Sequence, residues 1–108
     1  PALKGDFLKK EIERLMQRKE INWHLQTDYH FGGYTKWNNE LIDFINNFKV
    51  NFHIPLDPLY TGKMFFGIFD LIKKDFFPKG STIIAVHTGG LQGIQGFNQR
   101  FGDIISTD

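Results

Sequence analysis

The segment His87-Thr88-Gly89-Gly90 combines a titratable ring, a hydroxyl group and two glycines directly after an apolar run. Glycines let backbone N–H groups approach a ligand closely, and a threonine hydroxyl can donate a hydrogen bond to a heteroatom or accept one from it. These residues could therefore bind a polar cofactor or substrate. The alternative interpretation is a plain turn that needs glycine for its backbone angles, and the four residues taken alone favour it.

A second polar cluster runs from Asp57 to Lys63 and consists of Asp-Pro-Leu-Tyr-Thr-Gly-Lys. It lies at the expected N-terminus of an apolar helix, where free N–H groups and the helix dipole favour an anion. The pair Gly62-Lys63 lacks the preceding glycine spacing of a nucleotide-binding P-loop, so a site of that kind is excluded. A helix cap with Tyr60 packed in the core is the alternative interpretation of this segment.

Other chemistries have little support in the composition. The four histidines show no metal-ligand spacing, so we expect no metal site. The chain has no cysteine, which excludes a thiolate nucleophile and fits a reducing compartment, and we expect a cytoplasmic location. A net charge of +1 favours no nucleic-acid partner. No apolar run reaches the roughly 20 residues that cross a membrane, so we expect no membrane partner.

Three segments have the apolar periodicity of helices. Residues 7–16 follow Asp6, which is a suitable N-cap, and form a helix with a charged outer face. A second helix is expected from about Asn38, and a third, strongly apolar one over Met64 to Phe76. The apolar face of the second helix consists of Leu41, Ile42, Ile45 and Phe48, and that of the third of Phe65, Ile68, Phe69 and Ile72.

Two segments have the patterns of β-strands. In residues 21–26 apolar and polar side chains alternate, which is typical of a half-buried strand. Residues 82–86 form an unbroken, β-branched apolar run that suits a buried strand of a parallel sheet. The order β, α, α, β predicts an α/β fold with an open, parallel-type sheet and flanking helices. Because such sheets bind ligands beyond the carboxyl ends of their strands, the segment after residue 86 is the expected binding site.

The two polar segments together resemble a known enzyme family. Asp57–Met64, Pro78–Ser81 and Val86–Gly90 are similar to the C-terminal part of the 1-aminocyclopropane-1-carboxylate deaminase and D-cysteine desulfhydrase family. Members of that family are pyridoxal 5'-phosphate (PLP) enzymes of the tryptophan-synthase-β-like fold. The resemblance covers most of the chain, which starts at Pro1 without a methionine. We therefore expect residues 1–108 to be a single α/β fragment, the C-terminal portion of a larger PLP-dependent enzyme.

The resemblance also implies roles for individual residues. Tyr60 matches a tyrosine beside the cofactor and substrate, and Tyr34 matches a second tyrosine on the substrate side. Both are expected to be catalytic. The residues expected to bind the cofactor are Thr61, His87, Thr88, Gly89 and Gly90.

Two threonines set this chain apart from the aminocyclopropane carboxylate deaminases, which usually have Glu in place of Thr61 and Leu in place of Thr88. A neutral hydroxyl beside the pyridine nitrogen makes the ring a weaker electron sink than a carboxylate does. Loss of a thiol from the β-carbon needs less charge delocalisation than opening a cyclopropane. We expect a D-cysteine desulfhydrase-like lyase that gives pyruvate, ammonia and sulfide by α,β-elimination, with Thr88 as the partner of the pyridine nitrogen. The alternative is an aminocyclopropane carboxylate deaminase.

Part of the expected enzyme is missing from the sequence. The Schiff-base lysine and main phosphate loop of the family precede the region that this chain resembles, and neither Lys4 nor Lys63 matches that lysine. We expect the chain alone to be inactive, and the complete enzyme to be a homodimer that acts on a small amino acid. A non-enzymatic α/β binding or assembly module, self-associating through its Phe-rich helix, is the alternative from another class.

Overall fold

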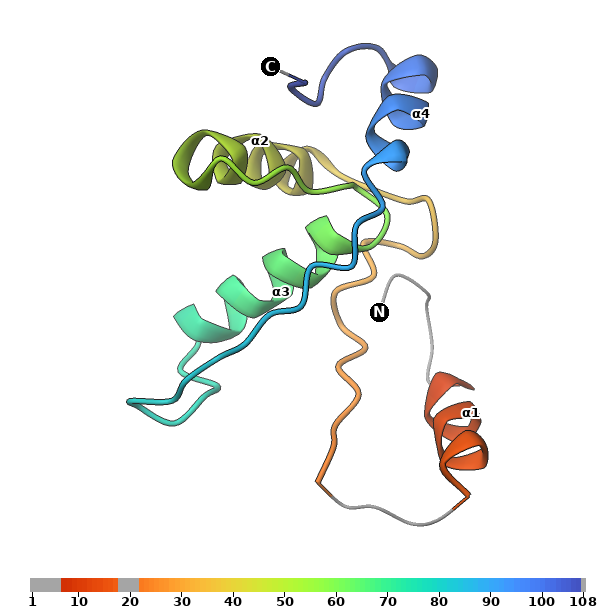
Figure 1. The fold of residues 1–108 in the computed structure, drawn as a ribbon, viewed down its shortest axis with the longest axis vertical. Coiled ribbons are helices and arrows are strands. Elements are labelled where there is room, and N and C mark those ends of the chain that lie inside the picture. Colours follow the sequence, from red (N-terminus) through yellow and green to blue (C-terminus); the bar gives the residue numbers. More distant parts are fainter. Residues whose placement is uncertain (1–6, 18–21, 108) are drawn as a thin grey trace.

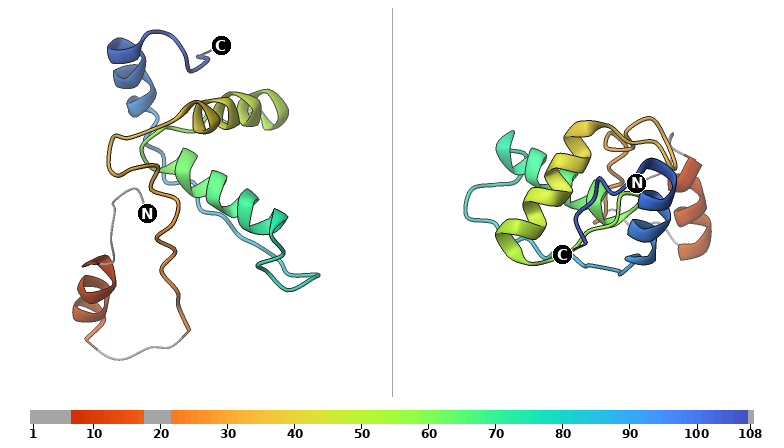
Figure 2. Two further views of the ribbon diagram at one scale, coloured as in Figure 1. Left: turned by 180° about the vertical axis from the view of Figure 1, so that it is seen from behind. Right: turned by 90° about the horizontal axis from the view of Figure 1, so that it is seen from above.

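The computed structural model describes residues 7–17 and 22–107. This part of the chain contains four helices, α1 (Phe7–Met16), α2 (Asn39–Phe52), α3 (Thr61–Lys73) and α4 (Gln92–Phe101). Helices α2 and α3 pack against each other, and α4 lies beyond them near the C-terminus (Figure 1). Helix α1 lies to one side of the other three, as the view from behind in Figure 2 also shows.

Helix α2 agrees with the sequence prediction. The side chain of Asn38 caps its N-terminus, with Oδ1 accepting a hydrogen bond from the backbone N of Leu41 at 2.8 Å. The helix ends at His53, whose positive φ of 57° lets its N–H reach the carbonyl of Lys49. The four residues of the predicted apolar face are buried, namely Leu41, Ile42, Ile45 and Phe48.

Helix α3 begins and ends three residues earlier than predicted, at Thr61 and Lys73. It starts early because the buried carboxylate of Asp57 accepts hydrogen bonds from the backbone at its first turn, including the N of Thr61 at 2.9 Å. The predicted apolar face is only partly correct. Phe65 and Phe69 pack against the core, whereas Ile72 is exposed.

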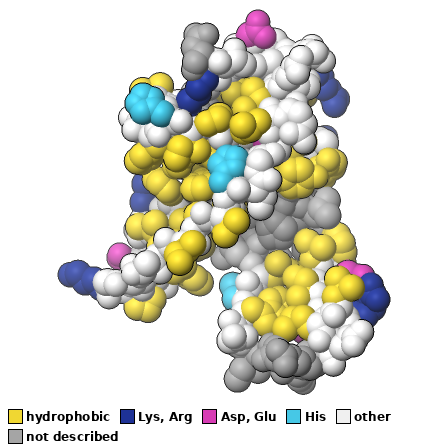
Figure 3. Space-filling model, in the orientation of Figure 1, with side chains coloured by type: hydrophobic (Ala, Val, Ile, Leu, Met, Phe, Trp, Pro, Cys, Tyr) yellow, Lys and Arg dark blue, Asp and Glu magenta, His cyan; other side chains and the backbone are white. Residues whose placement is uncertain are grey.

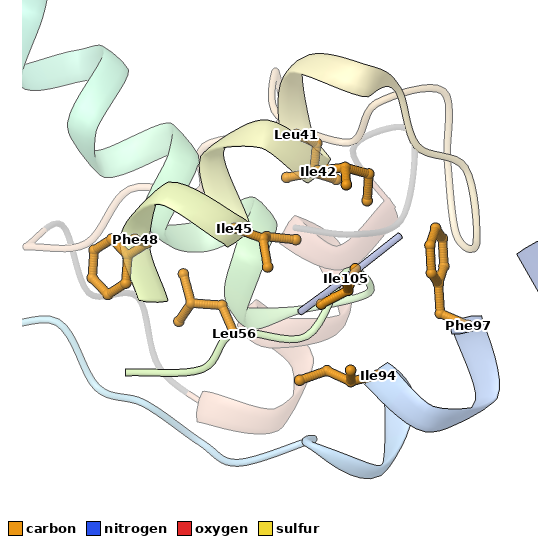
Figure 4. Packing of buried hydrophobic residues seen from close by; sticks show 8 residues of the cluster. All are labelled: Leu41, Ile42, Ile45, Phe48, Leu56, Ile94, Phe97 and Ile105. Atoms are coloured by element: carbon orange, nitrogen blue, oxygen red, sulfur yellow. The ribbon is translucent and has the colours of Figure 1, made fainter. Parts of the chain in front are cut away.

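The hydrophobic core joins α2 to α4 and to the segments that precede α3 and follow α4 (Figure 4). Phenylalanines of α2 and α3 surround it, with ring centroids 5–6 Å apart and many edge-to-face arrangements. The buried residues of this core are Leu41, Ile42, Ile45, Phe48, Leu56, Ile94, Phe97 and Ile105. Much of the aromatic content of the sequence is therefore used between α2 and α3.

Helix α4 was not expected from the sequence, because Gly93 and Gly96 disfavour a helix by about 1 kcal/mol each relative to alanine. Tertiary contacts outweigh this cost, since Ile94 and Phe97 are buried in the core. The side chain of Asn98 also exchanges two hydrogen bonds with the backbone of Ile105, at 2.9 and 3.1 Å. These contacts stabilise α4 against the segment that follows it.

The predicted α/β fold is wrong for the part of the chain that the structure describes, which contains helices and no strand. Residues 82–86 are extended and run alongside α3 (Figures 1 and 2), but α3 offers no backbone groups for a β-ladder. Ile84 and Val86 are 85% and 65% exposed, so the expected burial is also wrong. Residues 22–26 are likewise extended without a partner; the predicted cap Asp6 and first strand residue Ile21 lie outside the described residues.

Candidate functional site

Asp57 is a fully buried carboxylate in front of α3, with a relative exposure of 0%. Its Oδ1 accepts hydrogen bonds from the backbone N of Leu59 at 2.8 Å and of Tyr60 at 2.7 Å. Its Oδ2 accepts from the backbone N of Thr61 at 2.9 Å and from the Thr61 hydroxyl at 2.6 Å. Free N–H groups and the positive end of the helix dipole favour a negative charge at this place. Asp57 therefore fixes both the start of α3 and the backbone of Tyr60.

Tyr60 and Tyr34 meet although they are 26 positions apart in the sequence. The hydroxyl of Tyr60 donates to that of Tyr34 at 3.1 Å, and the ring centroids are 5.9 Å apart. This hydrogen bond is the main reason that the pKa of Tyr60 lies above its usual value. Both side chains remain about half exposed, so their hydroxyls stay accessible to a small molecule.

Lys63 in the first turn of α3 is buried, with 2% of its surface exposed. Its Nζ donates to the backbone carbonyls of His30 at 2.9 Å and Gly33 at 3.0 Å. Burial lowers the pKa of this lysine, and the negative charge of Asp57 partly counters the effect. The amine is thus engaged with the loop that precedes Tyr34.

His87 is locked by hydrogen bonds on both ring nitrogens. Its Nδ1 accepts from the backbone N of Gly89 at 3.0 Å, so the ring proton lies on Nε2, which is 2.9 Å from the carbonyl oxygen of Pro55. Gly90 has a positive φ of 79°, and a Cβ atom there would stand 3.0 Å from Oδ2 of Asp57. The glycine loop, residues 87–90, therefore packs directly on the carboxylate of Asp57 in front of α3.

A cavity of about 450 Å³ lies along one side of α3. Its lining is mostly apolar and comes from α1, the segment with Gln26 and Tyr29, Tyr60 with α3, and the glycine loop. Three predicted site residues line it, namely Tyr60, Thr61 and Thr88. A volume of this size lies within the roughly 300–1,000 Å³ of small-molecule sites. Tyr34 is not among the described lining residues but contacts Tyr60, which is.

The two threonines at the cavity differ in their free hydrogen-bonding capacity. Thr61 donates its hydroxyl proton to Asp57 and accepts from the backbone N of Asp57 at 3.0 Å, so it has no proton to offer a ligand. The hydroxyl of Thr88 makes no hydrogen bond to any residue in the described ranges 7–17 and 22–107. Of the two, Thr88 is the donor that can serve a ligand nitrogen.

These residues fit one wall of a PLP site. The apolar lining can accept a flat ring, and Thr88, which also lines the cavity, supplies a hydroxyl donor. The lining contains no carboxylate among the described residues, and its one lysine, Lys63, is bound to two carbonyls. The groups that would anchor the cofactor covalently are therefore not supplied by this wall.

The structure brings together most of the predicted site. Tyr34, Tyr60, Thr61 and the glycine loop gather around the start of α3. The sequence offered a helix cap in residues 57–63 only as the alternative, which the bonds of Asp57 bear out, although Tyr60 is half exposed; the structural role of Lys63 was missed. A carboxylate four residues before the helix start was the available signal for a cap. Nothing in the local sequence indicates that Lys63 reaches the loop some 30 residues away.

Comparison with curated proteins confirms the family resemblance. A Pyrococcus abyssi protein, provisionally named 1-aminocyclopropane-1-carboxylate deaminase, is 33% identical over 102 residues, which cover 91% of this chain and 30% of that protein. The 1-aminocyclopropane-1-carboxylate deaminase of Rhizobium radiobacter is 32% identical over 91 residues, which cover 84% of this chain and 26% of that protein. The chain is a relative of the 1-aminocyclopropane-1-carboxylate deaminases.

The chain spans less than a third of the length of these deaminases. A further deaminase, from Mesorhizobium japonicum, is 47% identical over 45 residues, which cover 42% of this chain and 13% of that protein. No family model matches the sequence, and no solved structure matches it. In the described part of the chain, none of the helices has the length and apolar character needed to span a membrane.

Proposed function

We propose that this chain is one wall of the active site of a PLP-dependent enzyme that releases ammonia from a small amino acid. When bound, PLP supplies an electron sink for bond breaking at the α-carbon of an amino acid. Thr88 would meet the pyridine nitrogen, and Tyr60 with Tyr34 would border the substrate. The kinship with named deaminases and the joint placement of Tyr60, Thr61 and Thr88 on one cavity support this proposal.

For the substrate, we propose a D-cysteine-like amino acid that loses its thiol by α,β-elimination. The supporting observation is that no carboxylate lines the described part of the cavity, where Thr88 offers a neutral hydroxyl. A neutral donor does not stabilise a protonated ring nitrogen as a carboxylate does. Elimination of a thiol tolerates the weaker electron sink that results, because the leaving group accepts the electrons.

The second candidate is the deamination of 1-aminocyclopropane-1-carboxylate. The names of the relatives favour it, because each of those described above is named for this activity and none for D-cysteine desulfhydration. On names alone this candidate fits better. The two candidates differ in their product, since only D-cysteine yields sulfide.

The full-length protein that carries this chain provides the test. We expect it, loaded with PLP, to release sulfide and pyruvate from D-cysteine, and Thr88→Val to lower kcat/KM for D-cysteine by at least about tenfold. Thr82→Val is the matched control, because Thr82 is exposed and does not line the cavity. Ammonia release from 1-aminocyclopropane-1-carboxylate without turnover of D-cysteine would establish the second candidate, and turnover of neither would refute both.

Thr61→Glu is a less suitable test of the electronic argument. The hydroxyl of Thr61 is bonded to the buried carboxylate of Asp57, so a second carboxylate there would disturb the start of α3 as well as the cavity. Thr88→Val and Thr88→Leu change the cavity wall without touching Asp57.

Further properties of the complete enzyme belong to the same proposal. We propose that the 108 residues are the C-terminal portion of the enzyme, which acts as a homodimer in the cytoplasm, and that the chain alone is inactive. The engagement of Lys63 with two carbonyls supports the last point. The rival assembly module is less favoured, since Phe65, Phe66 and Phe69 of α3 pack against the core. Absence of sulfide release by the isolated chain, beside an active full-length protein, is the expected result.

A further inference from the structure

The loop of residues 30–35 has an unusual backbone. Phe31 and Thr35 have positive φ angles of 57° and 67°, and Gly32 and Gly33 have 102° and 124°. Positive φ is unfavourable for residues other than glycine, so such a loop needs support from the surrounding structure. Within the loop, the backbone N of Gly33 donates to the carbonyl of His30 at 3.1 Å, that of Gly32 donates to Nδ1 of His30 at 2.9 Å, and that of Lys36 donates to the carbonyl of Gly33 at 3.0 Å. These bonds are internal to the loop and do not fix it relative to α3.

Lys63 connects this loop to α3. Its ammonium donates to the carbonyls of His30 and Gly33, the first and the fourth residue of the turn. A second contact joins the rings of Phe31 and Phe66, whose centroids are 4.9 Å apart. An apolar ring contact leaves room for sliding, whereas two hydrogen bonds from one charged group define a position. Burying an ammonium is costly, so its retention here calls for a specific role.

The position of the loop matters because Tyr34 directly follows Gly33. On the opposite side, Asp57 holds the backbone N of Tyr60 at 2.7 Å. Two buried charged residues at the start of α3 therefore hold the backbones on either side of the tyrosine pair. Asp57 fixes Tyr60, and Lys63 fixes the residue before Tyr34.

We infer that Lys63 is a positioning residue whose buried ammonium holds the carbonyl of Gly33 and thereby keeps the hydroxyl of Tyr34 against that of Tyr60. The effect on the tyrosine pair is a property of the fold. Its effect on turnover rests on the proposed function, in which the pair borders the substrate. Lys63 acts through Tyr34, because its ammonium is bonded to two backbone carbonyls of the preceding loop.

The test compares Lys63→Met with Lys73→Met in the full-length protein. Lys73 is an exposed lysine of the same helix and serves as the matched control. The ionisation of Tyr60 is followed by NMR of ring-labelled tyrosine, with Tyr60→Phe for assignment. We expect the pKa of Tyr60 to fall toward its ordinary value of about 10 in Lys63→Met, as in Tyr34→Phe, and to stay raised in Lys73→Met. An unchanged Tyr60 titration in folded Lys63→Met would overturn the inference.

A double-mutant cycle tests the consequence for turnover. We expect Lys63→Met to lower kcat/KM about tenfold in the wild-type background and less than twofold in the Tyr34→Phe background. Additive effects in the two backgrounds would show that Lys63 does not act through Tyr34. Because the Tyr60 titration needs neither substrate nor cofactor, a protein without turnover would refute the proposed function alone.

Loss of folding is a separate outcome of the experiment. If Lys63→Met does not fold, Lys63→Gln replaces it in both comparisons, since glutamine keeps an N–H donor without the charge. The expected direction is the same, with a smaller fall in the pKa of Tyr60. If neither variant folds, Lys63 supports the fold as a whole, and its assignment to the tyrosine pair is refuted.

Discussion

Three side chains near the start of α3 have roles that their type alone does not reveal. Asp57 belongs to a segment that the sequence offers only as a possible anion site or helix cap, but it is buried and accepts four hydrogen bonds. His87 would be read as a cofactor ligand, but both of its ring nitrogens are used within the chain. Thr88 has an uncommitted hydroxyl among the described residues and faces the cavity. At this scale, the predicted chemistry rests on Thr88 and the two tyrosines.

Asp57→Asn should be strongly destabilising for a change of one atom. Asparagine offers only one acceptor oxygen, and its NH₂ group would face N–H donors at the start of α3. We expect a loss of about 3 kcal/mol in the free energy of unfolding, because a buried charged acceptor is removed. Urea unfolding of the full-length protein measures this loss of free energy. Asp43→Asn, on the exposed face of α2, should change stability by less than about 0.5 kcal/mol.

The helices depend on a small number of close contacts. Helix α3 approaches α2 at Gly62, whose N–H also donates to the carbonyl of Asp57 at 2.8 Å. The other end of α3 is tied to the residue before the loop that leads to Tyr34, because the hydroxyl of Tyr29 donates a hydrogen bond to Asp70 at 2.6 Å. Asp70 also forms an ion pair with Lys74 at 2.8 Å. Both ends of the cavity-lining helix are therefore fixed by specific atoms.

Gly62→Ala tests the contact between α2 and α3. The added Cβ would stand 2.4 Å from the carbonyl oxygen of Asp57 and 2.7 Å from Cδ1 of Ile45, so the helices must move apart. We expect a loss of about 2 kcal/mol, as for other overpacked sites. Gly96→Ala in α4 is the control, because its Cβ meets nothing within 4 Å. That change should stabilise the protein by about 0.5–1 kcal/mol, and a stabilising Gly62→Ala would contradict the packing argument.

The ion pair at the end of α3 predicts a pH dependence. The hydrogen bonds from Lys74 and then Tyr29 lower the pKa of Asp70 in the folded state below its ordinary value of about 4. The stabilisation is therefore present above that value and is lost as the pH falls through the lowered pKa. We expect Asp70→Asn to lower the midpoint temperature of thermal unfolding at pH 7 and to leave it unchanged in strong acid. Equal effects at pH 7 and in strong acid would contradict this prediction.

The whole molecule exposes an unusual amount of surface. Its accessible area is 7896 Å², whereas a compact monomer of 12.6 kDa exposes about 6,200 Å². Hydrophobic side chains are visible across the face shown in Figure 3. The exposed large apolar side chains of the molecule include Ile84 and Val86 of the extended segment and two aromatic residues, Phe52 and Phe76, that are about half exposed. This surface is available for contact with further chain or with a second molecule.

The isolated chain should therefore associate with itself. We expect it to bind a hydrophobic dye such as anilinonaphthalene sulfonate and to sediment as more than a monomer. Ile84→Lys with Val86→Lys should reduce both signals, because these are its most exposed large apolar side chains after residue 80. Ser81→Lys adds a charge beside the same segment without removing an apolar group, and should change neither signal. Unchanged dye binding in the double variant would exclude this segment as the cause.

Helix α2 shows how much of the fold could be predicted from sequence. Its apolar residues recur every three or four positions and its cap is adjacent, so the local pattern determines both the helix and its buried face. The start of α3 and the presence of α4 could not be predicted in this way. They depend on Asp57 and on the packing of Ile94 and Phe97, which are contacts between separate segments.

The sequence by itself determined the helical periodicity, the two polar segments and the kinship with the deaminases. The tertiary structure decided which side chains meet. Tyr34 reaches Tyr60 across 26 positions, and Lys63 reaches Gly33 across 30. It also decided that the β-branched run of residues 82–86 lies extended beside a helix rather than in a sheet. The reason is physical: periodicity is set between neighbours along the chain, whereas burial, strand pairing and a shared site require partners that only the path of the chain brings together.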